Sequence, residues 1–342
     1  MFRSFVFAGA LWLHAAVLAH AADKIGFREA DLDIDGARPL HVAFWYPTRD
    51  QAVAVTVGEN RAFYGIGAIR DAVVADRTRP RVVLSHGYGG NWRNMNWLAA
   101  KLVEQGYVVA APDHPGTTTF NRDAKLAAAL SERPRDLTRV IDAILADQAL
   151  VGKVDESRIA AVGHSLGGWT VSALAGARFD IDRFRQDCRT NASPRACSLS
   201  EELGLDRPEL ESDLRDPRLG AFVSLDLGLA RGFDPDDLAR LRVPSLVLAA
   251  GIDVGDMPAR LESGYLAAHL PKATSAYVEI ADAMHFSFMQ TCKPGAAELI
   301  EAETPGDGIV CRDGGLRGRE EIHDEIASRV IEFLAKAIPA AP

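Results

Sequence analysis

The chain lacks several features that mark particular classes of protein. Its 342 residues carry a net charge of −9, and no basic stripe is present that would bind a phosphate backbone. Neither His-Glu-x-x-His nor paired Cys-x-x-Cys motifs occur, so no metal site is predicted. No Gly-x-Gly-x-x-Gly opens a helix after the first expected strand, so no nucleotide site is predicted. We therefore predict a protein with no cofactor and no nucleic-acid partner.

Long hydrophobic runs are also scarce. The apolar run at residues 5–18 is too short and too rich in alanine for a membrane span. Arg3 precedes it, and the Ala-His-Ala sequence at 19–21 follows it as a cleavage signal. We predict that residues 1–21 are a signal peptide, the alternative being an uncleaved anchor. After cleavage the protein would have no stable membrane span and would be exported, either periplasmic or extracellular.

Cysteine is rare, but its count is even, which is typical of disulfides in an exported chain. Three pairings of the four cysteines are possible. The local pairing closes two short loops and needs no long-range docking, so it is the one we favour. It joins Cys188 to Cys197 and Cys292 to Cys311.

The remaining sequence alternates short apolar strands with helices. Two N-terminal strands, at 25–35 and 38–48, meet at an Asp-Gly turn, and residues 51–79 read as irregular. Further strands are expected at 81–85, 107–111, 158–162, 219–225, 245–250 and 276–280. Helices are expected at 91–105, 135–148, 234–241, 259–269 and 320–337. This alternation predicts one α/β domain over residues 22–342, with a doubly wound, mostly parallel sheet and antiparallel strands at its N-terminal side.

Residues 176–217 interrupt the alternation. This segment, called the insert below, is rich in charged residues and proline and holds two of the cysteines. Structureless loops of such length are uncommon and usually functional. We predict a disulfide-containing cap over the functional site, the alternative being a surface excursion far from it.

The most informative motif is Gly-His-Ser-Leu-Gly at 163–167. It follows the expected strand 158–162 and precedes the start of a helix. A strand, a Gly-x-Ser-x-Gly turn and a helix form the nucleophile elbow of an α/β-hydrolase. Glycines are needed there because side chains beside the strained turn would collide with the strand or helix. Ser165 is thus the candidate nucleophile.

A serine nucleophile needs a histidine base that follows it in the chain of this fold. Three histidines follow Ser165: His269, His285 and His323. His285 comes just after the last expected strand, where a loop returns to the carboxyl edge of the sheet. The other two lie in expected helices, so His285 is the predicted base.

The acid that orients this histidine has three candidates. Asp253 follows the strand 245–250 and occupies the usual loop, which makes it the first choice. Asp226 ends the preceding strand and is the alternative acid. Asp256 is the third choice.

Acyl transfer also needs hydrogen-bond donors for the oxyanion. The backbone amide of Leu166, directly after the nucleophile, is one predicted donor. The sequence Ser-His-Gly-Tyr-Gly-Gly at 85–90, called the oxyanion loop below, follows a strand and matches the loop that supplies the second. By position we choose the amide of Tyr88. His114 ends another strand at this edge and is a further candidate for lining the site.

Several of these motifs together resemble one known group. Besides the elbow and the oxyanion loop, they are Gly-Phe-Arg at 26–28, Val-Ala-Phe-Trp-Tyr-Pro at 42–47 and His-Phe-Ser-Phe at 285–288. The chain resembles bacterial α/β-hydrolases called predicted dienelactone hydrolases, which are similar to platelet-activating-factor acetylhydrolases and to cutinase-like polyester hydrolases. The resemblance runs from about Gly26 to the terminal helix.

The resemblance implies a serine esterase that uses Ser165, an aspartate and His285, with oxyanion donors at Tyr88 and Leu166. In acetylhydrolases the acid occupies the place of Asp226, whereas in cutinase-like enzymes it occupies the place of Asp253. The elbow serine differs from the cysteine nucleophile of true dienelactone hydrolases. The insert is absent from compact cutinase-like enzymes.

The leading hypothesis is therefore a secreted serine hydrolase that cleaves carboxylic esters through an acyl-enzyme intermediate. Its substrate would be a small-molecule or lipid-like ester. One alternative is a non-catalytic envelope binding protein on the same fold. Within enzymes, the same residues would serve a lipase, lactonase or thioesterase. The sequence leaves the oligomeric state open.

Overall fold

The computed structural model describes residues 24–191, 194–315 and 317–340. The expected signal peptide at 1–21 lies outside these described residues. Across the described part of the chain, no helix has both the length and the apolar character that a bilayer crossing requires.

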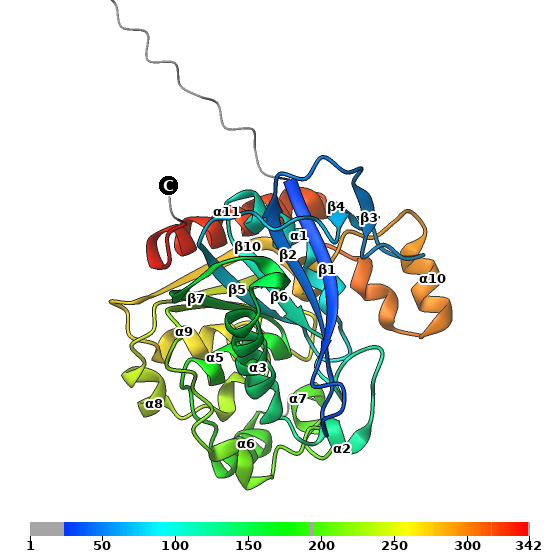
Figure 1. Ribbon diagram of the computed structural model, residues 1–342. Helices are drawn as coiled ribbons and strands as arrows, with labels where there is room; N and C mark the ends of the chain where they lie inside the picture. The colour runs from blue at the N-terminus through cyan, green and yellow to red at the C-terminus, as the bar shows by residue number, and fades with distance from the viewer. Residues whose placement is uncertain (1–23, 192–193, 316, 341–342) are drawn as a thin grey trace, which may run out of the picture.

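Within the residues that the structure describes, one ten-stranded sheet runs through the middle of the molecule (Figure 1). Its strand order is β10-β9-β8-β7-β5-β6-β2-β1-β4-β3. From β10 to β6 all neighbouring strands are parallel. Strand β2 is antiparallel to both β6 and β1. The structure confirms the predicted sheet, including its antiparallel N-terminal side. The strands are β1 (Lys24–Leu32), β2 (Leu40–Thr48), β3 (Val55–Val57), β4 (Ile66–Arg70), β5 (Arg79–Ser85), β6 (Val108–Pro112), β7 (Val154–His164), β8 (Ala221–Leu225), β9 (Ser245–Ile252) and β10 (Ser275–Met284).

Helices cover both faces of this sheet (Figure 1). The α-helices are α1 (Asn96–Glu104), α2 (Ala124–Ala127), α3 (Glu132–Ala146), α4 (Gln148–Val151), α5 (Leu166–Leu174), α6 (Ile181–Thr190), α7 (Pro194–Ser198), α8 (Pro235–Arg240), α9 (Ser263–His269), α10 (Ala296–Glu303) and α11 (Arg319–Ala337). The 3-10 helices are η1 (Trp92–Met95), η2 (Pro208–Glu211), η3 (Ala230–Gly232), η4 (His285–Phe288) and η5 (Asp307–Cys311).

Two hydrophobic layers hold these helices against the sheet. Side chains alternate along a strand, so Val82 and Leu84 of β5 join the layer under α1 and α11, whereas Val83 joins the layer under α3 and α5. Helix α11 contributes apolar residues four positions apart, beginning with Ile322 and Ile326, which places them on one face. The core therefore lies on both sides of the central strands.

The expectation that residues 51–79 are irregular is wrong in part. Strands β3 and β4 lie there and pair antiparallel with each other, and β4 also pairs with β1. They have three and five residues, too few for an alternating pattern to be read from the sequence. They extend the edge of the sheet far from the elbow.

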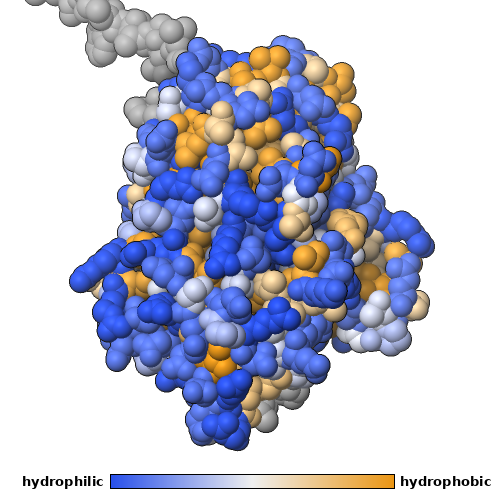
Figure 2. Space-filling view, turned by 60° about the horizontal axis from the view of Figure 1, so that its bottom comes forward, coloured by the Kyte–Doolittle hydropathy of each residue, from blue (hydrophilic) through white to orange (hydrophobic). Residues whose placement is uncertain are grey.

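The predicted local disulfides are confirmed: Cys188 is bonded to Cys197, and Cys292 to Cys311. The first lies in the insert, which folds into α6, α7 and η2 rather than a structureless loop. The face that carries α6 and α7 is largely hydrophilic, with hydrophobic side chains in separate patches (Figure 2).

Candidate functional site

The elbow places Ser165 between the end of β7 and the start of α5. Its backbone has φ 57°, a conformation that residues other than glycine rarely adopt. Only glycine fits at the two flanking positions, because a Cβ there would overlap neighbouring backbone atoms. A Cβ on Gly163 would lie 2.0 Å from the carbonyl oxygen of Gly167, and a Cβ on Gly167 would lie 1.9 Å from that of Ser85. The sequence therefore folds here into a tight turn that presents one hydroxyl.

Three side chains meet at this turn in a chain of hydrogen bonds, called the cavity triad below. The Oγ of Ser165 lies 3.0 Å from Nε2 of His285, and Nδ1 of His285 lies 2.6 Å from Oδ2 of Asp226. Ser165 follows β7, Asp226 follows β8 and His285 follows β10, so strand ends bring them together. The structure thus joins the predicted nucleophile, the predicted base and the alternative acid.

Asp253, the first choice for the acid, does not bond to His285. Strand β9 continues to Ile252, two residues past its expected end, and carries Asp253 beyond the level of Ser165 and Asp226. Its Oδ1 accepts instead from the amide of Ala259, 2.7 Å away, within its own loop. The third choice, Asp256, accepts from Arg195 of the insert.

Asp226 is held in place on both sides. Its Oδ1 accepts from the amide of Ala250 on β9 at 2.9 Å, which leaves Oδ2 for His285. The backbone φ of Asp226 is 42°, so Asp226 is, after Ser165, the second residue of the triad with a positive φ. Non-glycine residues in such conformations cluster at functional sites, because the surrounding fold must enforce them.

His164, the second residue of the elbow, supports the backbone of His285. Its Nε2–H donates to the carbonyl oxygen of His285 at 2.8 Å, and the two rings lie 4.8 Å apart. Burial, with His285 nearby, lowers the pKa of His164 to about 3. It therefore stays neutral at ordinary pH. Its position inside the Gly-x-Ser-x-Gly motif is the signal that could have singled it out.

The oxyanion loop is fixed by His86. Its Nδ1–H donates to the carbonyl oxygen of Gly87 at 2.7 Å, and its Nε2 accepts from the amide of His114 at 3.0 Å. The Gly87 carbonyl and the Tyr88 amide belong to one trans peptide plane and point in opposite directions. Holding the carbonyl against His86 therefore orients the Tyr88 N–H away from it. Burial keeps the pKa of His86 well below its usual value, so the imidazole stays neutral and keeps Nε2 as an acceptor.

Leu166 is the first residue of α5, where amides have no acceptor within the helix. Tyr88, Leu166, Ser165 and His285 all line one cavity of about 90 Å³. The two predicted amide donors thus belong to residues beside the nucleophile.

The insert supplies much of this cavity's wall. Ala196, Leu199 and Leu203 line it from the insert, and Leu229, Met257 and Phe286 line it from the other side. Most of these side chains are apolar, so the cavity favours an apolar group next to Ser165. The prediction that the insert covers the site agrees with this arrangement.

Polar contacts tie the insert down on both sides of the cavity. The hydroxyl of Tyr88 donates to Glu202, and Nε of Arg195 lies 3.1 Å from Oδ2 of Asp256. Burial and the neighbouring Glu202 carboxylate raise the pKa of Tyr88 to about 12, so it remains a hydrogen-bond donor. No sequence pattern marked Glu202 or Arg195.

Glu262 is a buried carboxyl in the cavity wall that sequence reasoning also missed. Its Oε2 accepts from the amide of Ala230 at 2.8 Å, and its Oε1 lies 3.6 Å from the Arg231 guanidinium. Burial raises the pKa of Glu262 to about 7. Arg231 also pairs with Asp187 of α6 at 3.0 Å, which links the insert to this wall.

His114 does not line the cavity. It belongs to a second chain of hydrogen bonds, called the buried triad below, in which His114 Nε2 lies 2.9 Å from Ser85 Oγ and Nδ1 lies 2.9 Å from Asp136 Oδ2. All three side chains are fully enclosed. Arg38 and Arg133 reach the same group, the first bonding Asp136 and the second bonding Ser85 and the carbonyl oxygen of His86. This network lies beneath the oxyanion loop and supports it.

Known proteins share parts of this chain. Cutinase est2 of Thermobifida alba is 32% identical over 108 residues, which are 31% of this chain and 33% of that protein. Bis(hydroxyethyl) terephthalate hydrolase of Streptomyces coelicolor is 30% identical over 104 residues, 30% of this chain and 31% of that protein. The chain thus spans about a third of the length of these curated relatives.

A solved structure is similar over nearly the whole length. The ferulic acid esterase from Streptomyces cinnamoneus aligns with a TM-score of 0.63 over 94% of this chain and 92% of that one, at 20% sequence identity. This likeness shows a shared fold. The profile of the alpha/beta hydrolase family matches residues 82–297, which include all three residues of the cavity triad and more than half of the chain. The protein therefore belongs to the alpha/beta hydrolase family.

Proposed function

We propose that the protein hydrolyses carboxylic esters through an acyl-enzyme intermediate. The observation that carries this proposal is the cavity triad beside the Ser165 cavity. Its serine hydroxyl lies 3.0 Å from the imidazole, and the imidazole lies 2.6 Å from the carboxylate. The cutinase and terephthalate-ester hydrolase named above, each of which matches about a third of its length, support the same chemistry.

In this mechanism Asp226 accepts from Nδ1–H of His285 and so leaves Nε2 free to act as the base. As the Ser165 oxygen attacks the ester carbonyl carbon, its proton moves to Nε2. The tetrahedral intermediate then collapses, and Nε2–H gives that proton to the departing alcohol oxygen. Water repeats both steps on the acyl-enzyme and releases the carboxylic acid.

The developing oxyanion would be stabilised by the amides of Tyr88 and Leu166. Such fixed donors contribute most where they need not reorganise during the reaction. His86 meets that need for Tyr88, because it holds the preceding carbonyl with a neutral ring. The buried network beneath the loop adds rigidity without touching the substrate.

The substrate we propose is an ester with a short acyl group. The cavity of about 90 Å³ is well below the roughly 300–1,000 Å³ usual for small-molecule sites, which suits a chain of only a few carbons. The insert narrows the approach through its contacts at Tyr88 and Asp256. This favours small-molecule or lipid-like esters over a bulky polymer.

We further propose that the protein is exported, as the N-terminal sequence predicts. Two disulfides fit an oxidising compartment. The pairing of His285 with Asp226 supports a place in the acetylhydrolase-like group that the sequence motifs indicate.

A fluorophosphonate probe tests the mechanism and separates it from a binding protein on the same fold. We expect one label, found on Ser165 by mass spectrometry, and loss of that label together with p-nitrophenyl acetate turnover in Ser165→Ala. Absence of labelling in the folded wild-type protein would contradict the esterase mechanism and favour the non-catalytic binding protein.

The substrate class is tested by widening the cavity. Leu199 lines it and is only partly buried, so Leu199→Ala should fold and admit longer chains. We expect the ratio of kcat/KM for p-nitrophenyl octanoate to that for the acetate to rise about tenfold. Leu299→Ala, an equally half-buried leucine on α10, is the matched control. Equal profiles in the two variants would remove this cavity as the acyl site.

A further inference from the structure

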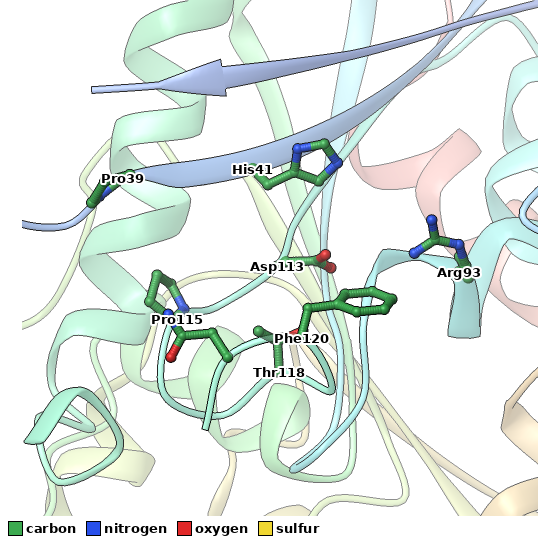
Figure 3. A pocket seen from close by; sticks show the side chains of 8 residues that line it. Pro39, His41, Arg93, Asp113, Pro115, Thr118 and Phe120 are labelled. Atoms are coloured by element: carbon green, nitrogen blue, oxygen red, sulfur yellow. The ribbon is translucent and has the colours of Figure 1, made fainter. Parts of the chain in front are cut away.

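A second cavity lies beside the oxyanion loop (Figure 3). Its volume is about 340 Å³, at the lower end of the roughly 300–1,000 Å³ usual for small-molecule sites. Among the described residues, those that line it and those that line the Ser165 cavity are different sets. It is therefore a separate place for a ligand.

A buried carboxylate points into this second cavity. Asp113 follows β6, and the residue is 6% exposed. Its Oδ1 accepts from the amide of Trp92 at 2.7 Å. Figure 3 shows the carboxylate between the side chains of His41 and Phe120. Burial raises its pKa to about 6, since few donors replace the water it has lost. A ligand hydroxyl would provide such a donor.

The surface of the other walls is mostly apolar and includes an aromatic side chain. Phe120, which lines this cavity, is 63% exposed and so offers apolar surface to a ligand. The guanidinium of Arg93 lies 5.0 Å from the centre of that ring. Both ring nitrogens of His41 are engaged by carboxylates of β1, Nδ1 by Asp31 at 2.7 Å and Nε2 by Glu29 at 3.3 Å. His41 thus has only ring carbons left for the cavity.

Charges around the cavity balance, which favours a neutral ligand. Three positive side chains face three negative ones, either in its wall or bonded to it. The positive ones are His41, Arg93 and Arg70, and the negative ones are Asp113, Glu29 and Asp31. His41 counts as positive because its hydrogen bond to Glu29 raises its pKa to about 9. An ionic ligand would leave one charge without a partner, at a cost that hydroxyl groups avoid.

We propose that this second cavity binds a neutral sugar ring, with one hydroxyl donating to Asp113, a neighbouring hydroxyl accepting from Arg93, and the C–H face of the ring against Phe120. A sugar combines an apolar face with an edge of adjacent hydroxyls, each able to donate and accept. The cavity offers an apolar plate, one acceptor and one fork of donors. The shared chemistry serves both a free monosaccharide and a sugar unit of a polysaccharide.

The lining segment is joined to the oxyanion loop by backbone hydrogen bonds. The amide of Gly89 donates to the carbonyl of Thr117 at 2.9 Å, and the amide of Thr119 donates to that of Gly90 at 2.8 Å. A sugar bound here would therefore lie close to the Ser165 cavity while leaving that cavity free.

The proposal is tested by titration calorimetry on the full-length mature protein carrying Ser165→Ala, so that its outcome does not depend on hydrolysis. The probes are glucose, xylose and arabinose and their tetrasaccharides. We expect saturable binding that weakens about tenfold when Phe120→Ala removes the ring face, and also in Asp113→Asn. Tyr277→Ala, another exposed aromatic, on β10, is the matched control and should bind as the parent does.

Tighter binding of tetrasaccharides would identify a polysaccharide unit as the ligand, and equal affinities a free sugar. The proposal is overturned if no sugar binds, or if Phe120→Ala binds as tightly as the parent. It is also overturned if 4-methylphenol binds at this cavity and the sugars do not. Phe120 is exposed, so its variant should fold and keep the test decisive even where Asp113→Asn does not.

Discussion

The cavity triad and the buried triad have the same order of groups and nearly the same distances. The histidine–serine distances are 3.0 and 2.9 Å, and the histidine–aspartate distances are 2.6 and 2.9 Å. They differ in access, because the first borders a cavity and the second is fully enclosed. Triad geometry by itself therefore does not make a catalytic site. A substrate must also be able to reach the hydroxyl.

Charge separates the two groups as well. In the buried triad, Nη2 of Arg133 lies 3.3 Å from Ser85 Oγ. Burial, and then the Arg133 charge, lower the pKa of His114 to about 3. Such an imidazole does not take a proton at neutral pH, so it cannot serve as a base. The buried triad is instead a scaffold that positions the oxyanion loop.

The largest expected effect comes from removing each serine hydroxyl in turn. Ser165→Ala should lower kcat for p-nitrophenyl acetate by about 10⁶-fold, since the nucleophile is lost. Ser85→Ala should keep the fluorophosphonate label on Ser165 and lower kcat far less. Turnover of p-nitrophenyl acetate and fluorophosphonate labelling are measured on purified variants that circular dichroism shows to be folded alike. Equal losses in the two variants would show that the hydroxyl of Ser85 is as necessary for turnover as that of Ser165.

The two aspartates should fail in different ways. Asp226→Asn should lower kcat about 10⁴-fold with little change in stability, because the imidazole loses its correct tautomer. Asp136→Asn should lower the free energy of unfolding by about 3–5 kcal/mol, because it leaves the buried guanidinium of Arg38 without its carboxylate. Urea unfolding and kcat measured on the same samples separate the two. An Asp136→Asn variant as stable as the wild type would contradict the role of the buried triad as a scaffold.

The buried triad should also shape the dependence of stability on pH. The pKa of His114 is about 3 in the folded protein and about 6.5 in an unfolded chain. Between these values the unfolded chain binds one more proton, so stability rises with pH and is lost as pH falls through the window. His114→Asn should reduce that slope by up to about 1.4 kcal/mol per pH unit. Urea unfolding at several pH values measures it, and an unchanged slope would contradict the burial argument.

The sequence predicted the fold well where patterns are strong. Most of the parallel strands follow from a continuous apolar run, and α11 follows from apolar residues that recur on one face. Short elements such as β3, β4 and α2 were missed, since three to five residues carry no readable period. Strand ends were also misjudged: β10 continues to Met284 through an irregular register after Ile280.

The candidate site divides in the same way. Ser165 and His285 follow from a motif and from chain order, and the structure brings them together. The choice of Asp226 over Asp253 depends on how far β9 extends, which the apolar pattern did not determine. The cavity's walls, including Glu202 and Glu262, come from segments whose contacts depend on tertiary packing.

The smallest expected effect concerns Asp253, the carboxylate that sequence reasoning ranked first. Asp253→Ala removes one hydrogen bond to the amide of Ala259 in an open loop. We expect a loss of about 1 kcal/mol in stability or less, and kcat/KM close to that of the wild type. Asp226→Asn, measured beside it, provides the contrast. Should Asp253→Ala instead lose activity to the same degree, His285 would take Asp253 as its partner in solution, and the cavity triad would have to be redrawn around β9.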